Sequence, residues 1–227
     1  NTPALKMELL TVMDNYAKCL QKAPLSVEDY SFLLTNFHDI MVTSDTGVRA
    51  EILRLIRYGL VSKEHCITVL KCELHQLVIV SFEKDKDSDV IERMQALKVI
   101  KMFISMVPNE FPIAYARSLV SAAASENDSF RRVSLETLRE LALVNSVVVS
   151  QSTGFIVMVK AIIDPTIQDM SEVLLCTMLK LVSSPRSRID LRVLLNQRIL
   201  LSPFTDMDSN VDNKDVYSRL LASKSAF

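Results

Sequence analysis

Four nine-residue segments of this 227-residue chain align with one another without gaps. They begin at Ile52, Ala96, Thr137 and Met178. Each has a leucine at its second position, a basic residue at its third and an aliphatic residue at its fifth, and the leucines are Leu53, Leu97, Leu138 and Leu179. Successive leucines are 44, 41 and 41 residues apart. A helical sequence with a period of about 40–47 residues is typical of armadillo and HEAT repeats.

This repeat predicts the fold class. A single unit of this kind cannot bury its own apolar face, so neighbouring units stack and build an extended surface. We therefore expect an all-α, armadillo/HEAT-like right-handed α-solenoid of about four to five helix-pair repeats over residues 1–204. Apolar residues also recur with helical spacing in five further ranges, which are 4–22, 27–42, 64–82, 109–124 and 147–163.

Two segments fit the pattern less well. Residues 147–163 contain runs of β-branched residues that suit a strand. A strand would have no partner in a stack of helices, so a helix is expected there. Residues 205–227 are polar and acidic and lie outside the repeat. We expect a flexible segment in this range, with a short helix at about 214–223.

Composition excludes several other classes of protein. Apolar residues make up 49% of the chain, which is enough for a continuous core, and glycine occurs only three times. Tight β-hairpins and phosphate-binding loops both need glycine, so neither is expected. A net charge of −1 gives no general attraction to nucleic acid. The longest apolar run, 155–159, is far shorter than the roughly 18 residues of a membrane span. The four cysteines have no paired spacing. We therefore expect them to act as small apolar side chains in a reducing cytosol.

The segment from His65 to His75 is the one stretch that resembles a metal site. On a continuous helix, His65, Cys72 and His75 share a face, but the seven residues from His65 to Cys72 span about 10.5 Å. Zinc ligands converge within about 2.0–2.3 Å of one ion, so these side chains cannot bind it together. Asp87 and Asp89 belong to a solvated charge run, and no nucleotide-binding or hydrolase motif occurs. We expect no catalytic, cofactor-binding or metal-binding residues and no enzymatic activity.

A column of basic residues follows the repeated leucines. This basic column consists of Arg54, Lys98, Arg139 and Lys180. Stacked repeats would place equivalent residues in a line along the solenoid, where they could bind an acidic or phosphorylated partner. The alternative is a solvated helix face whose charges pair with neighbours such as Glu51 and Glu136.

Longer strings of the sequence resemble the N-terminal armadillo region of the Rictor and Pianissimo family. They are IERMQALKVIKMFI at 91–104, FRRVSLETLRELAL at 130–143, LSPFTD at 201–206 and LLASK at 220–224. The likeness runs over roughly residues 45–224, and the order and spacing of the strings make it specific.

The resemblance implies a non-enzymatic scaffold domain in a subunit of TOR complex 2. It implies binding to the TOR kinase and to a stress-kinase-interacting adaptor subunit, in a complex that also contains a small β-propeller subunit. The family acts in growth and cytoskeletal signalling, which implies a cytoplasmic location with recruitment to membranes as part of the complex. The alternative is an armadillo module of an unrelated pathway that binds cargo or the cytoskeleton. Such a module would share the periodicity but lack the strings at 91–104 and 201–206.

Overall fold

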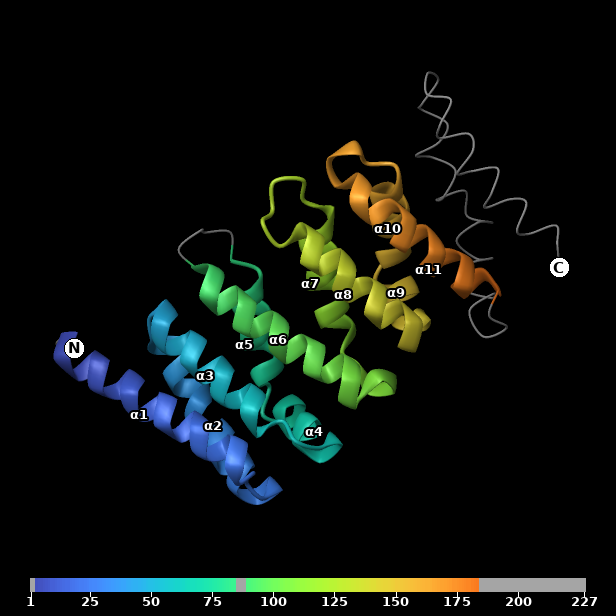
Figure 1. The fold of residues 1–227 in the computed structure, drawn as a ribbon. Helices are drawn as coiled ribbons and strands as arrows, with labels where there is room; N and C mark the ends of the chain where they lie inside the picture. Colours follow the sequence, from blue (N-terminus) through green and yellow to red (C-terminus); the bar gives the residue numbers. More distant parts are fainter. Residues whose placement is uncertain (1–2, 85–88, 184–227) are drawn as a thin grey trace. The chain divides into compact units, whose positions relative to one another are not determined.

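The computed structural model describes residues 3–84 and 89–183, which contain eleven α-helices, two short 3₁₀ helices and no β-strand (Figure 1). The all-α class that the repeat predicts is confirmed. The first six helices are α1 (Pro3–Lys22), α2 (Val27–Thr43), α3 (Thr46–Gly59), α4 (Lys63–Lys71), α5 (Leu74–Phe82) and α6 (Val90–Met106). The next elements are η2 (Pro108–Glu110), α7 (Ile113–Ala124), α8 (Arg131–Val144), α9 (Ser146–Gln151), α10 (Gly154–Ile162), η3 (Pro165–Met170) and α11 (Ser171–Ser183). The predicted segment 205–227, with its helix at 214–223, lies outside the described residues.

The chain folds into two compact units, Asn1–Phe111 and Pro112–Phe227. In the first unit, α3 lies between α1 and α6 (Figure 1). Behind this row, α2 packs on α3, α4 and α5, and α5 packs on α6. Because α3 has neighbours on several sides, most of its apolar residues are buried, and these are Val48, Ala50, Ile52, Leu53, Leu55 and Ile56.

One glycine allows α2 to approach α3 closely. The ring of Tyr30 on α2 is fully buried, and its hydroxyl donates a 2.9 Å hydrogen bond to the carbonyl oxygen of Ile56. A Cβ atom added at Gly59 would lie only 2.2 Å from the Tyr30 ring. Gly59 therefore gives the tyrosine the space to lie against the end of α3.

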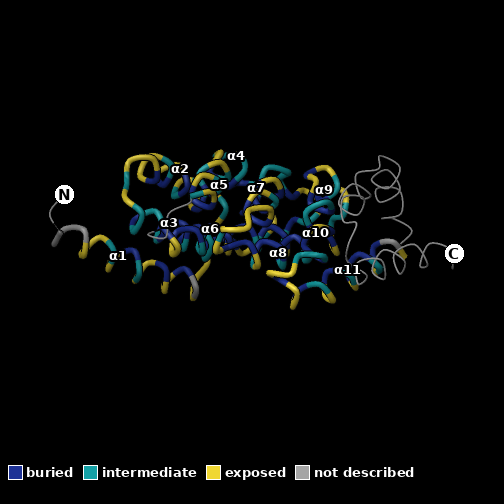
Figure 2. The backbone as a smooth tube through the Cα atoms, turned by 90° about the horizontal axis from the view of Figure 1, so that it is seen from above, coloured by how far each residue is buried: buried dark blue, intermediate teal, exposed yellow. Residues whose placement is uncertain are grey.

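The second unit repeats this arrangement of packed helices. α7 packs on α8 and α10 packs on α11, while α7 contacts α10 and α8 contacts α11. The short α9 packs against α7 and α8. Within each unit, buried positions lie where helices face one another and exposed positions lie on their outer sides (Figure 2).

The prediction of single helices over 64–82 and 147–163 is wrong, because each range contains two helices. Glu73 separates α4 from α5, and Thr153 separates α9 from α10. Both residues adopt the left-handed conformation, with φ of 57° and 64°, which interrupts the ladder of helical hydrogen bonds. The helical character of 147–163 is confirmed despite its β-branched residues. Each break is preceded by a short helix and followed by a nine-residue helix and a longer helix. The segments α4–α5–α6 and α9–α10–α11 are therefore helix triplets instead of the predicted pairs.

Gly154, directly after the second break, sits at a close approach within this corner. An added Cβ atom would lie 2.8 Å from a methyl group of Val149 and 3.4 Å from Val120. The glycine thus allows α10 to start against α9 and α7.

Three of the four repeated leucines lie in the core. Leu53, Leu97 and Leu138 are at most 1% exposed, and Leu179 is half-buried. The burial of Leu97 and Leu138 agrees with the packing of neighbouring helices that a repeat of this kind requires. Burying a leucine side chain contributes about 1.5–3 kcal/mol, so this column is a main source of stability in each unit.

Candidate partner-binding surface

The basic column is distributed over four helices that belong to both units. Arg54 lies on α3 and Lys98 on α6 in the first unit, while Arg139 lies on α8 and Lys180 on α11 in the second. Lys98 and Lys180 are exposed, and both arginines are half-buried. Since α3 packs on α6, Arg54 and Lys98 occupy equivalent positions on neighbouring helices. A single line of all four residues stays a prediction, because Arg54 and Lys98 belong to one unit and Arg139 and Lys180 to the other.

Arg54 is engaged by two carboxylates. Its Nη2 lies 2.7 Å from Oδ1 of Asp14 on α1 and 2.6 Å from Oε2 of Glu51, one turn earlier on α3. Burial lowers the pKa of Arg54, but both carboxylates outweigh this, so its pKa lies above the ordinary value. Hydrogen bonds from Lys18 and then from Arg54 lower the pKa of Asp14. The positive charge of Arg54 is therefore compensated locally, and in the first unit Lys98 is the exposed member of the column.

The expected pairing of the column with neighbouring glutamates holds at one of the two proposed residues. Glu51 does pair with Arg54. Glu136 instead lies 3.9 Å from Arg132, four residues earlier on α8.

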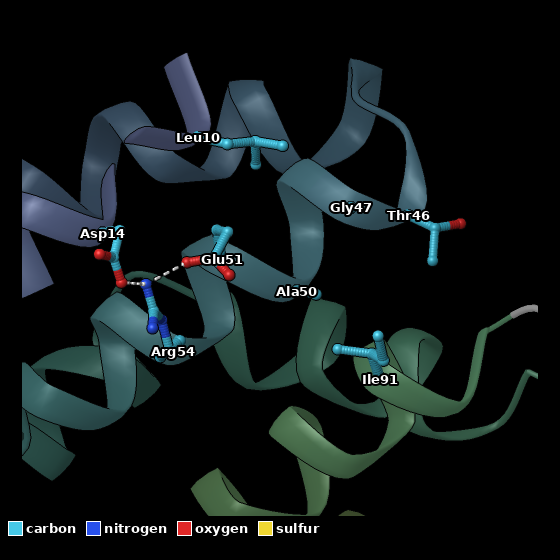
Figure 3. Close-up of a pocket in the computed structure, with 8 residues that line it drawn as sticks. All are labelled: Leu10, Asp14, Thr46, Gly47, Ala50, Glu51, Arg54 and Ile91. Atoms are coloured by element: carbon cyan, nitrogen blue, oxygen red, sulfur yellow. Dashed lines mark hydrogen bonds and ion pairs between the residues drawn. The ribbon is translucent and has the colours of Figure 1, made fainter. Parts of the chain in front are cut away.

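A pocket of about 510 Å³ opens beside Arg54 on the face of α3 (Figure 3). α1 and α6 form its walls, and the small residues of α3 leave the space between them. It is lined by Leu10, Asp14, Thr46, Gly47, Ala50, Glu51, Arg54 and Ile91. Figure 3 shows the Asp14–Arg54–Glu51 cluster at one end, with Leu10 and Ile91 on opposite walls. Since both carboxylates already bind a guanidinium, this mixed polar and apolar lining suits binding of a partner segment better than proton transfer.

A buried ion cluster connects α3 to α6. Glu92 on α6 is fully buried, and its carboxylate accepts hydrogen bonds of 2.8 and 3.1 Å from Arg49 on α3. Lys84 donates to both oxygens of the same carboxylate at 3.1 Å. Arg49 also donates to the carbonyl oxygen of Ser44 at the end of α2. A buried charge is tolerated only when it is paired and hydrogen-bonded, and here two cations satisfy one carboxylate.

The second unit contains a similar cluster around Arg131, which is 9% exposed. Its guanidinium donates to the carboxylate of Asp164, to Oγ1 of Thr166 at 3.0 Å and to the carbonyl oxygen of Ala123 at 3.4 Å. Burial raises the pKa of Asp164, but the hydrogen bonds from Thr166 and Arg131 together lower it by a larger amount. The pKa of Asp164 therefore lies below its ordinary value. The cluster joins α7, α8 and η3.

Sequence reasoning missed these clusters, although one signal was available. Arg49 and Arg93 each lie four residues before a repeated leucine and are 44 residues apart, which is the repeat spacing. Both donate to a carbonyl oxygen at the end of the preceding helix, Arg49 to Ser44 and Arg93 to Phe82. This role orients a helix and is structural.

The assumption of a continuous helix from His65 to His75 is wrong, because the break at Glu73 separates Cys72 from α5. His65 is buried and bonds with Oγ of Ser62 at 2.9 Å and with the carbonyl oxygen of Leu25 at 3.2 Å. Burial raises the pKa of the Cys66 thiol to about 11. Within residues 3–84 and 89–183, no three histidine, cysteine, aspartate or glutamate side chains gather as a metal site.

Across the same described residues, no single helix has the length and apolar character needed to cross a membrane. α4 and α5 reach that length only together, and they are bent by 87° at their break.

Comparisons with known proteins agree on one family. The family model described as "Rapamycin-insensitive companion of mTOR, N-term" matches residues 10–227. "Protein pianissimo A" of Dictyostelium discoideum is 33% identical over 159 residues, covering 70% of this chain and 14% of that protein. "Rapamycin-insensitive companion of mTOR" of Mus musculus is 29% identical over 210 residues, covering 88% of this chain and 12% of that protein. "Target of rapamycin complex 2 subunit TSC11" of Saccharomyces cerevisiae is 28% identical over 181 residues, covering 79% of this chain and 12% of that protein.

The matched region is thus a small part of each relative, 12–14% of its length. These relatives are named as a companion of mTOR and as a subunit of a complex, which agrees with the prediction that this chain is non-enzymatic. The strings quoted above lie within the residues that the family model matches, so the resemblance to Rictor and Pianissimo is confirmed. The chain belongs to the family of the N-terminal region of the rapamycin-insensitive companion of mTOR, the Rictor family.

Proposed function

We propose that this region is an armadillo-like, right-handed α-solenoid that serves as a scaffold in a subunit of TOR complex 2. The observation that carries the proposal is the family match over residues 10–227, together with yeast relatives that are named as subunits of that complex. The helix triplets and the register of 44, 41 and 41 residues support the solenoid, because a single repeat cannot bury its own apolar face and stacks on the next repeat.

The proposed partners are the TOR kinase and the stress-kinase-interacting adaptor subunit, in an assembly with the small β-propeller subunit. In this role the region would support growth and cytoskeletal signalling from the cytoplasm, with recruitment to membranes through the complex. A repeat array suits this task because it offers a long binding surface without a catalytic pocket.

We also propose the basic column as part of the partner-binding surface. Lys98 and Lys180 are exposed, so each can meet a carboxylate or phosphate on a partner. Arg54 would join such a contact by exchanging Asp14 or Glu51 for the partner's anion. Individual exposed ion pairs contribute about 0–1 kcal/mol, so binding would depend on several contacts at once and weaken with salt.

Affinity purification of the full-length protein with and without residues 45–200 tests the scaffold role. The proposal expects the kinase and the adaptor to co-purify with the intact protein and to be lost from the deletion variant, as quantified by mass spectrometry. A complete complex assembled around the deletion variant would contradict it.

The surface is tested by charge reversal. The variant Lys98→Glu/Lys180→Glu should reduce capture of the adaptor or kinase more strongly at low salt than at physiological salt. The matched control Lys71→Glu/Lys160→Glu changes the net charge equally at exposed positions outside the column. Equal capture by the two double variants, with unchanged thermal melting, would show that the column is only a solvated face.

A further inference from the structure

The pocket beside Arg54 exists because α3 carries small residues on its outer face. The repeat register pairs Gly47 with Ile91 of α6 and Ala50 with Met94, since the members of each pair are 44 residues apart. Gly47 and Ala50 both line the pocket, and their spacing of three residues places them on one face of the helix. The space that larger side chains would take on α3 is therefore left open between α1 and α6.

The polar end of the pocket contains a carboxylate that lacks a hydrogen-bond donor. The lining has two carboxylates, Asp14 and Glu51, and one guanidinium, Arg54. Asp14 accepts a hydrogen bond from Arg54 at 2.7 Å and pairs with Lys18 at 2.6 Å. Glu51 forms an ion pair with Arg54 at 2.6 Å, but its buried Oε2 accepts no hydrogen bond from the described residues. The Glu51 side chain is 26% exposed, so a ligand can reach its carboxylate. This end of the pocket therefore suits a group that is positively charged and donates hydrogen bonds.

We propose that this pocket takes a lysine side chain from a partner subunit of the complex, an inference that rests on the proposed scaffold function. The methylene stem of the lysine lies over Gly47 and Ala50, between the two apolar walls, and its ammonium group donates to Glu51 (Figure 3). Lysine suits the site better than arginine, because a second planar guanidinium needs two free carboxylate oxygens and Arg54 already contacts both acids. Together with an anion at Lys98, this lysine defines a partner segment with charges of both signs.

Carbodiimide cross-linking of the purified complex, assembled with the full-length protein, tests the occupant. The reagent joins a carboxylate to an amine where the two are in direct contact, and the exposed pair of Lys63 and Glu110, at 2.6 Å, is the internal standard. We expect mass spectrometry to identify a link between Glu51 and a lysine of another subunit. If no complex assembles, the scaffold function and this site are both wrong. If the complex assembles and Glu51 forms no link, or links only to its own polypeptide, the site alone is wrong.

Two substitutions of one glycine separate the pocket from general reactivity. Gly47→Ile places on α3 the side chain that α6 has at the equivalent position and fills the pocket, whereas Gly47→Ala leaves most of the space. We expect the yield of the Glu51 link to be roughly tenfold lower in Gly47→Ile than in Gly47→Ala, because the inserted side chain overlaps with the lysine. The link between Lys63 and Glu110 should be unchanged. Equal yields of the Glu51 link in the two variants would overturn the proposal.

Carboxylate labelling gives a readout that needs no substitution. Glycine ethyl ester, coupled by carbodiimide, labels accessible carboxylates in the isolated full-length protein and in the complex. We expect roughly tenfold less labelling of Glu51 in the complex, because the lysine then occupies the pocket most of the time. Glu28 of α2 is exposed and serves as the control that is labelled equally in both states. Equal labelling of Glu51 in both states would show that the pocket stays open to solvent and would overturn the proposal.

Discussion

Replacing Leu138 by alanine should destabilise the second unit strongly. Leu138 is fully buried on α8, so the substitution removes apolar atoms from the core and leaves a cavity. Deletions of this kind cost about 2–5 kcal/mol of the free energy of unfolding. The chain offers a matched control on the same helix, because Leu143 is 46% exposed. Leu143→Ala loses only part of the transfer free energy and leaves no closed cavity, so its expected cost is below about 1 kcal/mol.

Urea unfolding of the 227-residue chain, followed by far-UV circular dichroism, measures both variants. The two substitutions delete the same atoms from the same type of residue in one helix, so a difference between them reports burial. We expect a clearly lower midpoint for Leu138→Ala at an unchanged slope. Equal midpoints for the two variants would refute the register that places the repeated leucines in the core.

Gly59→Ala should lower the free energy of unfolding by about 1–3 kcal/mol, because the added methyl group overpacks against the buried tyrosine of α2. Gly47→Ala, in the first turn of α3, should be neutral or slightly stabilising, and thermal melting of the two variants measures the difference. Glu92→Gln should cost about 1–3 kcal/mol because it leaves two half-buried cations without their carboxylate. Glu110→Gln, at an exposed ion pair, should cost about 0–1 kcal/mol, and similar losses for the two variants would contradict the buried cluster. Since the folded pKa of Asp164 is lowered, its contribution to stability is complete above about pH 4 and is lost as the pH falls through the folded value. Asp164→Asn should therefore flatten the fall in unfolding free energy on acidification, and an unchanged pH profile would argue against this linkage.

The sequence allowed the helical class and the buried leucine column to be predicted, because periodicity is a local property of the chain. Leu53, Leu97 and Leu138 each lie at the centre of the apolar stripe of a helix. Such a residue is buried whichever helix packs on that stripe. The breaks at Glu73 and Thr153 could not be predicted in this way. Neither residue is a glycine, and a left-handed conformation at such a position is maintained by the packing of the flanking helices.

Less of the candidate site could be predicted from the sequence. The pairing of Arg54 with Asp14 joins residues 40 positions apart on different helices, and only the packing of α1 on α3 brings them together. The cluster of Arg49 and Glu92 depends in the same way on the packing of α3 on α6. A search of the repeat register for charged residues, in addition to leucines, would have identified Arg49 and Arg93 as a matched pair.

A cryo-electron microscopy map of the purified complex that contains the full-length protein would show directly whether this region is a scaffold. We expect the helices of residues 3–84 and 89–183 to contact the TOR kinase or the adaptor subunit. We also expect Lys98 on α6 to lie within such a contact, close to a carboxylate or phosphate. A map in which this region is ordered but touches no other subunit would contradict the scaffold role.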